Sequence, residues 1–322
     1  MNNNTNYQKY SNLLKKLSIT EIGKIKFDDT NGYFISSGLK ENKEILIKVS
    51  PDNDLEKWIQ YKKELKADKV INQINSNKKG GKQIKKPSVI NIGKNESIQW
   101  LLREYIEGET LSEYDFNKPI KGYDVLKEDF VKKEYLIDQI ANFINTCKNN
   151  SSGTISKFSS VNRYESNLDK LNLDNVCNEI NFDLFYSRKI YNKNLATYLN
   201  KSNLCVSFGD FIPSNILINN SEEVFISDFE WLSIDNNTTD GAMLWLFLHR
   251  YPKWQKRLIA KLIKNRNDQL LFNMSVIRII LNWYYGLYVL MYDDKSKMNL
   301  LNKKYFRKHQ WLEYLKRIQR NV

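Results

Sequence analysis

A chain of 322 residues, of which 41% are hydrophobic and 27% are charged, is long enough to fold as one large domain or as two closely packed lobes. Its formal net charge of +13 favours anionic partners such as nucleotides, phosphorylated sugars, nucleic acid or acidic lipid surfaces, although a solvated coat of lysines would give the same excess. The chain has only two histidines, and its three cysteines form no CxxC pair, which argues against histidine-dependent hydrolysis, a zinc site and a disulfide framework and fits a reducing cytoplasm.

The first hundred residues predict a small sheet with one helix. Short stretches rich in β-branched and aromatic residues, separated by Asp, Asn and Gly turns, predict strands at residues 21–27, 32–37, 44–50, 88–93 and 99–106. From Asp54 onwards the apolar residues follow a helical period, with Asp52 or Asn53 as the expected N-cap. Residues 75–87 predict an exposed basic loop, and "EGET" at 107–110 predicts a turn.

The remainder of the chain predicts helices, interrupted by short strands near residues 204–208, 216–219 and 224–227. Apolar residues from Leu126 to Ile144 mark one face of a single long amphipathic helix. The most apolar stretch, residues 276–292, contains Arg278 and is short for a membrane span, so we expect a buried core helix. The last basic helix is expected to pack its aromatic and aliphatic stripe on this part of the chain, with contact to an anionic membrane as the alternative.

This order of elements predicts an α+β protein in two parts. Residues 1–104 would form a small lobe with an antiparallel sheet and one helix, and residues 105–322 would form a larger, mainly helical lobe. We expect the chemistry to lie between a sheet lobe and a helical lobe of this kind.

A polar loop followed by a short hairpin carries the strongest chemical signal. In "GDFIPSN" Asp210 and Asn215 lie on a loop that Pro213 keeps from becoming a helix. If residues 216–219 pair with residues 224–227, Asn215 and Asp228 reach the same end of the hairpin. Carboxylate and amide oxygens suit Mg²⁺, and a nearby carboxylate can accept the proton of an attacking hydroxyl. The pattern therefore predicts the parts needed for phosphoryl transfer.

The stretch "FGDFIPSNILI…VFISDFEW" closely resembles the aminoglycoside phosphotransferase and choline kinase family, the small-molecule branch of the protein-kinase-like fold. The resemblance implies a bilobal fold, ATP and Mg²⁺ as cofactors, and transfer of the γ-phosphate to a hydroxyl group of a small molecule. It implies Asp210 as the catalytic base and Asn215 and Asp228 as the magnesium ligands. Glu230, where many members carry a second acid, would have an accessory metal role.

The resemblance continues upstream and covers about residues 23–245 of the chain. In "ILIKV" Lys48 would contact the α- and β-phosphates, with Glu64 as its ion-pair partner and Glu56 as the alternative. The backbone of Glu104 and Ile106 would hydrogen-bond adenine.

One cleft for a metal-bound triphosphate is then expected to be lined by four side chains: Lys48, Asp210, Asn215 and Asp228.

Two departures from the family pattern keep other functions open. The histidine that precedes Gly-Asp in the family is Phe208 here, and the phosphate-covering segment "DDTNGYFISSG" has no GxGxxG pattern. A nucleotide-binding pseudokinase or scaffold is therefore one alternative. Transfer of AMP in place of phosphate is another.

The charge of the C-terminal part bears on the acceptor. Residues 230–322 carry 17 lysines and arginines against 7 acidic residues. Polycationic aminoglycosides need an acidic rim, so this excess argues against them, unless Asp240, Asp293 and Asp294 form a local acidic pocket. A neutral or anionic acceptor, such as a sugar, an amino alcohol, a sugar phosphate or a glycolipid head group, fits better, and aminoglycoside modification is the alternative. Nucleic acid is not favoured, because no lysine run is interleaved with aromatic residues.

Overall fold

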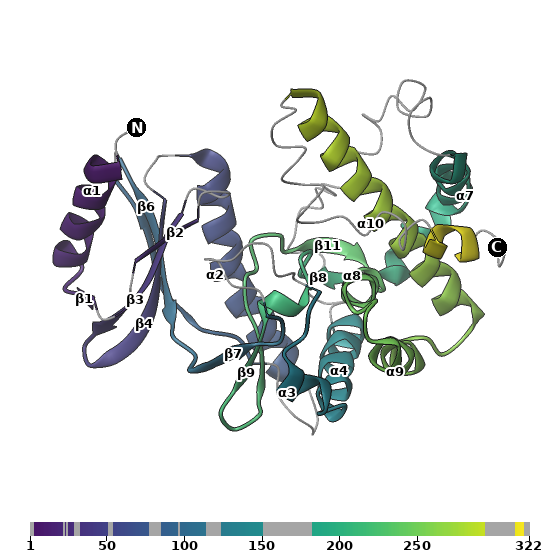
Figure 1. Cartoon of the computed structure of the whole chain (residues 1–322), viewed down its shortest axis with the longest axis horizontal. Coiled ribbons are helices and arrows are strands. Elements are labelled where there is room, and N and C mark those ends of the chain that lie inside the picture. Colours follow the sequence, from purple (N-terminus) through teal and green to yellow (C-terminus); the bar gives the residue numbers. More distant parts are fainter. Residues whose placement is uncertain are drawn as a thin grey trace. The chain divides into compact units, whose positions relative to one another are not determined.

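The computed structural model describes residues 3–21, 23, 25–28, 33–50, 54–76, 85–95, 97–113, 124–150, 182–293 and 313–318 (Figure 1). The chain divides into two compact units. Unit 1 comprises Met1–Glu109 and Ile216–Leu232, and unit 2 comprises Thr110–Asn215 and Ser233–Val322. The domain boundary after residue 104 stays a prediction.

Unit 1 is built on an antiparallel sheet with the order β1-β3-β4-β6-β5, in which β2 also pairs with β3. The strands are β1 (Thr20–Glu21), β2 (Lys26–Asp28), β3 (Tyr33–Lys40), β4 (Lys43–Ser50), β5 (Val89–Lys94) and β6 (Gln99–Glu104). Alternate side chains of β4, namely Ile45, Ile47 and Val49, are buried in one apolar cluster. Since successive side chains of a strand point to opposite faces, Lys48 lies on the other face of the sheet.

A helix covers each face of this sheet, and Figure 1 shows α1 and α2 on its two sides. The helix α1 (Asn3–Lys16) was not predicted from the sequence. Its asparagine-rich start has weak helix propensity, but Tyr10, Leu13 and Leu14 recur at helical spacing and are buried against the β4 cluster. Tertiary packing therefore stabilises a helix that local propensity does not indicate.

The second helix, α2 (Leu55–Ser76), is the predicted one. Its N-terminus is capped by Asp54, whose Oδ1 accepts the backbone N–H of Glu56 at 2.7 Å. The two caps expected from the sequence, Asp52 and Asn53, lie outside the described residues, as does most of the predicted basic loop. The side of α2 that meets the sheet carries Tyr61, which packs on Leu101 of β6.

The predicted hairpin is confirmed within unit 1. Strands β9 (Ile216–Asn219) and β10 (Val224–Ile226) pair antiparallel, with Ile216 opposite Ile226. A third strand, β7 (Gly108–Thr110), adds to β9, so the prediction of a simple turn at residues 107–110 is wrong. A Cβ atom at Gly108 would lie 2.4 Å from the carbonyl oxygen of Ile218, so only glycine permits this close pairing.

Over its described residues, unit 2 is mainly helical and contains a small sheet. Its helices are α3 (Glu128–Val131), α4 (Tyr135–Asn150), α7 (Phe182–Tyr198), α8 (Thr239–Phe247), α9 (Pro252–Leu262) and α10 (Arg266–Asp293), and residues 313–318 are also helical. The small sheet pairs β8 (Leu204–Ser207) with β11 (Ser233–Asn236), a strand that was not predicted.

The core of unit 2 lies among α7, α8, α10 and residues 313–318. The first part of the predicted apolar stretch is buried there, namely Val276, Ile277, Ile279, Ile280 and Leu281, and the side chains from residue 283 to the end of α10 lie outside the described ones. No helix in the described part of the chain is long and apolar enough to cross a membrane. Tyr314, Leu315 and Ile318 are buried in the same cluster, which agrees with the packing expected for the last helix.

The single long helix expected between Leu126 and Ile144 is wrong, because the chain forms α3 and α4 with a break after Val131. The indole Nε1–H of Trp254 donates to the carbonyl of Val131 at 3.2 Å. In a continuous helix that carbonyl would accept a backbone N–H from the next turn. Here it accepts the indole N–H of a residue on α9, so the break in the helix goes together with the packing of α9.

Candidate functional site

The loop between β8 and β9 places Asp210 beside Asn215. The loop is tightened by backbone bonds from Ile212 N–H to Asp210 O and from Asn215 N–H to Ile212 O, both at 3.0 Å. The amide nitrogen of Asn215 donates to the carbonyl oxygen of Asp210 and to its carboxylate Oδ2, each at 2.9 Å. The structure therefore brings these two predicted residues together within unit 2 and orients the half-buried carboxylate of Asp210.

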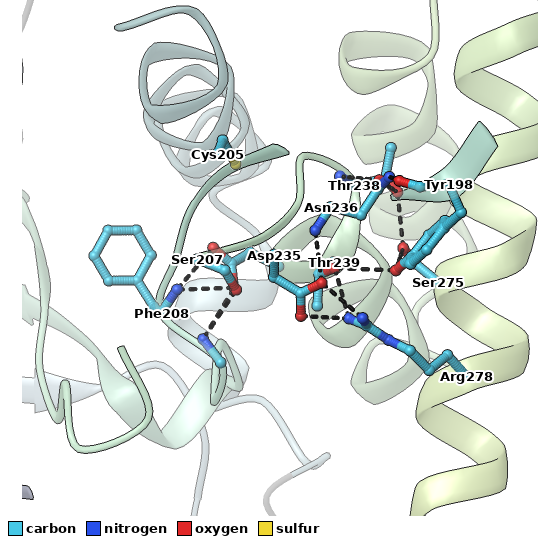
Figure 2. Close-up of polar contacts among 12 residues, drawn as sticks. Tyr198, Cys205, Ser207, Phe208, Asp235, Asn236, Thr238, Thr239, Ser275 and Arg278 are labelled. Atoms are coloured by element: carbon cyan, nitrogen blue, oxygen red, sulfur yellow. Dashed lines mark hydrogen bonds and ion pairs between the residues drawn. The ribbon is translucent and has the colours of Figure 1, made fainter. Parts of the chain in front are cut away.

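A buried carboxylate from α8 fixes the start of this loop, of which Figure 2 labels Ser207 and Phe208. Asp240 accepts hydrogen bonds from Ser207 Oγ at 2.8 Å, from Phe208 N–H at 3.1 Å and from Gly209 N–H at 3.2 Å. Gly209 has a φ of 76°, the left-handed region that favours glycine. Burial raises the pKa of Asp240 to about 6, against the lowering effect of these donors.

This geometry corrects the expected role of Asp240. The sequence allowed Asp240 to form part of an acidic pocket for a cationic acceptor, but its carboxylate is buried and faces the loop backbone. Its role in the loop was missed. The sequence feature that could have indicated this role is an acidic residue in the first turn of an otherwise apolar helix, because unpaired backbone N–H groups lie at that end of a helix.

Phe208 stands where the family that the sequence resembles has a histidine, and it has a structural role here. Its N–H donates to Asp240, while its ring packs against Phe143 at 5.0 Å and Phe211 at 6.0 Å between ring centroids. The aromatic cluster and the backbone bond together hold the residue two positions before Asp210. The departure from the family pattern therefore leaves the loop anchored.

Phe208→Ala is expected to lower the free energy of unfolding by about 3–5 kcal/mol, because it leaves a cavity among buried aromatic rings. Phe208→Leu, which retains most of the volume, should cost less than about 1.5 kcal/mol. Urea denaturation of the two variants and the wild type measures both. An alanine variant as stable as the leucine variant would contradict the packing role of this ring.

In unit 1, Lys48 on β4 forms a buried ion pair with Glu230. The side chains are 11% and 10% exposed, and the Lys48 ammonium also lies 4.1 Å from the centre of the Tyr33 ring. Burial would lower the pKa of Lys48, but attraction to Glu230 and Asp228 outweighs burial and raises that pKa above its ordinary value. Burial raises the pKa of Glu230, and Lys48 opposes that rise.

The expected pair between Lys48 and Glu64 is not formed. Glu64 Oε1 instead accepts the backbone N–H of Phe229 at 2.8 Å and lies 3.8 Å from Arg103 Nη1. Because Glu230 satisfies the ammonium and Phe229 satisfies the carboxylate, each member of the expected pair has another partner. Glu56, the alternative, is exposed at the start of α2.

Asp228 has the features of a cation ligand. It has a φ of 64°, a left-handed conformation that costs a non-glycine residue on the order of 1–3 kcal/mol and that clusters at functional sites. Its Oδ1 is buried and has no hydrogen-bond partner in the described part of the chain. Within those residues no three His, Cys, Asp or Glu side chains form a metal-binding group. This donor set fits Mg²⁺, which needs only one or two protein oxygens.

The two residues expected to contact adenine lie at the end of β6. Glu104 is its last residue and its backbone N–H donates to Ser88 O at 2.9 Å. Ile106 follows two residues later and is half-buried. Their contact with a base stays a prediction, as does the convergence of the four predicted side chains on one cleft.

Comparisons with known proteins bear on the fold. No protein-family model matches the sequence, and no curated protein is similar to it. Among solved structures, similarity extends over nearly the whole chain. A thermostable mutant of an aminoglycoside phosphotransferase gives a TM-score of 0.60 at 10% identity, covering 96% of this chain and 97% of that one. The choline kinase of Streptococcus pneumoniae gives 0.58 at 13% identity, covering 95% and 98%.

A spectinomycin phosphotransferase in complex with ADP and spectinomycin gives a TM-score of 0.57 at 11% identity, covering 96% of this chain and 93% of that one. At such identities the likeness establishes the fold. The chain therefore has the protein-kinase-like α+β fold of the small-molecule phosphotransferases, and the predicted fold class is confirmed.

Proposed function

We propose that this protein is an ATP- and Mg²⁺-dependent phosphotransferase that moves the γ-phosphate to a hydroxyl group of a small molecule. The observation that carries the proposal is Asp228, a strained residue with a buried carboxylate oxygen that lacks a hydrogen-bond partner among the described residues. Support comes from the fold, since the similar spectinomycin phosphotransferase was solved with ADP and the similar choline kinase with AMP.

The predicted residues would divide the chemistry among nucleotide binding, metal binding and proton transfer. In unit 1, Lys48 would bind the α- and β-phosphates, and the backbone of Glu104 and Ile106 would bind adenine. Asp228 and Asn215 would hold Mg²⁺ through a carboxylate and an amide oxygen. Mg²⁺, when bound, would neutralise negative charge on the phosphate oxygens.

Asp210 in unit 2 would act as the base. Its carboxylate would accept the proton of the acceptor hydroxyl as the hydroxyl oxygen forms a bond to the γ-phosphorus. The bond from that phosphorus to the β-phosphate oxygen breaks, and ADP leaves with the electron pair. The hydrogen bond from Asn215 to Asp210 Oδ2 supports this role, because it holds the carboxylate in one orientation.

The acceptor is proposed to be neutral or anionic, such as a sugar, an amino alcohol or a sugar phosphate. The basic excess of residues 230–322 supports this choice. The burial of Asp240 against the loop backbone also supports it, because that carboxylate is committed to Phe208 and Gly209. Aminoglycoside modification is the competing assignment, and it would need an acidic surface elsewhere.

Incubation of the protein with Mg²⁺, γ-labelled ATP and a panel of sugars, amino alcohols and aminoglycosides tests the function. We expect label in a neutral or anionic acceptor, and mass spectrometry should give the added mass of a phosphate and not of AMP. ADP with Mg²⁺ should also raise the melting temperature. No melting shift at millimolar ADP together with no labelled product would favour a scaffold and defeat the proposal.

A further inference from the structure

Glu230 has an observed partner that the proposed reaction does not explain. Its carboxylate pairs with the ammonium of Lys48, the group expected to bind nucleotide phosphates. We propose that Glu230 is an internal competitor for Lys48, so that a nucleoside diphosphate or triphosphate binds by exchanging its phosphate for this carboxylate. Glu230 would then be a positioning residue that sets nucleotide affinity. The inference rests on the proposed function, because it needs a phosphate that reaches Lys48.

The exchange follows from the burial of Lys48. Nearly all of this side chain is buried, and the Tyr33 ring covers part of its ammonium. A buried ammonium without an anionic partner is strongly unfavourable, so one carboxylate or phosphate oxygen must stay beside it. Glu230 supplies that anion within the chain, and a phosphate oxygen has the same charge and hydrogen-bonding character.

The backbone around Glu230 is held independently of Lys48. Glu64 accepts the N–H of Phe229 at 2.8 Å, and the Phe229 side chain is buried with the Lys86 ammonium 5.5 Å from its ring centre. Release of Lys48 therefore requires only that the side-chain torsions of Glu230 change. The strand that carries Lys48 is also fixed, since β4 pairs with both β3 and β6.

The sequence suggested a different role for Glu230, that of an accessory metal ligand. The two roles predict opposite effects on nucleotide affinity. A competitor weakens ADP binding whether Mg²⁺ is present or absent, whereas a metal ligand strengthens ADP binding and acts only with Mg²⁺. The contact in the structure, which joins Glu230 to an ammonium, favours the competitor.

Calorimetric titration of ADP into Glu230→Gln, with EDTA and separately with Mg²⁺, tests the proposal. If Lys48 is released in about one wild-type molecule in ten, removal of the carboxylate should lower the Kd for ADP about tenfold in both conditions. Adenosine, which has no phosphate, should bind both proteins equally. The KM for ATP should fall in parallel.

Two further variants distinguish the exchange of carboxylate for phosphate at Lys48 from a general effect of losing one negative charge. Glu230→Asp keeps the charge but is one methylene shorter, so it cannot keep the contact while Glu64 holds the backbone, and it should also bind ADP more tightly. Glu223→Gln removes a carboxylate from a different ion pair of unit 1, the one with Lys85, and should leave ADP affinity unchanged. If Glu230→Gln fails to fold, the ADP affinity of Glu230→Asp tests the proposal in its place.

Several results would overturn the exchange. ADP affinity that is unchanged in EDTA and weaker with Mg²⁺ would identify a metal ligand. Tighter binding in the glutamine variant alone would identify loss of negative charge as the cause. Wild-type binding of ADP with no effect in either variant would defeat the inference and leave the proposed function standing, whereas a wild type that binds no ADP would defeat both.

Discussion

Asp210→Asn is expected to lower kcat about 10²–10⁴-fold, the range usual for loss of a general base, while the Kd for ADP stays within about twofold. Asparagine keeps the shape of aspartate, and its side-chain oxygen can still accept the hydrogen bond from Asn215. It cannot accept the proton of the acceptor hydroxyl. Turnover of the best acceptor from the panel and calorimetric titration with ADP measure the two quantities.

A matched substitution controls for loss of negative charge in unit 2. Asp138 on α4 pairs with Arg257, and Asp138→Asn removes a carboxylate from that ion pair. Since partly exposed ion pairs contribute little to stability, this variant should fold and keep wild-type turnover. If Asp210→Asn is as active as Asp138→Asn, Asp210 is not the catalytic base, and the strongest residue assignment fails.

Those parts of the fold that depend on nearby residues could be predicted from the sequence. The strand with Lys48, the helix after Asp54 and the β9–β10 hairpin each follow from a local apolar period or from turn residues. The contact between Asp210 and Asn215 also joins residues only five positions apart. A fold class could then be predicted because such elements combine in few ways.

The partners of the buried charges could not be predicted in this way. Lys48 pairs with Glu230 across 182 positions, and Asp240 reaches Phe208 across 32. The sequence indicated Glu64 as the partner of Lys48, with Glu56 as the alternative, and it gave Glu230 only an accessory metal role. No local pattern points to a pair between Lys48 and Glu230. The fold places the carboxylate of Glu64 at the backbone N–H of Phe229 and the carboxylate of Glu230 at the ammonium of Lys48.

Elements that need tertiary contacts were missed for a related reason. Strand β11 has the sequence "SIDN", which has little strand propensity, and it exists because it pairs with β8. That pairing also carries Asp235 into the interior, where it meets Arg278 of α10. In the sequence, this arginine appeared only as a charge within an apolar stretch.

Loss of the Arg278 side chain is expected to cost about 3–5 kcal/mol of unfolding free energy, because it leaves the Asp235 carboxylate buried without its counter-charge. Both side chains are 1% exposed. Arg278 Nη1 donates to Asp235 Oδ1 at 2.6 Å, and Nη2 donates to Thr239 Oγ1 at 3.0 Å (Figure 2). Urea denaturation of Arg278→Met measures the loss.

The double variant Asp235→Leu/Arg278→Met distinguishes a structural ion pair from a packing defect. Apolar residues of similar volume can replace a buried ion pair at little or no cost, so the double variant should be more stable than Arg278→Met alone. Because β11 pairs with β8, and β8 ends at Ser207 just before the Asp210 loop, the double variant should also retain turnover below its melting temperature. Equal stability of the single and double variants would show that the cost comes from lost packing around α10 and not from the unpaired Asp235.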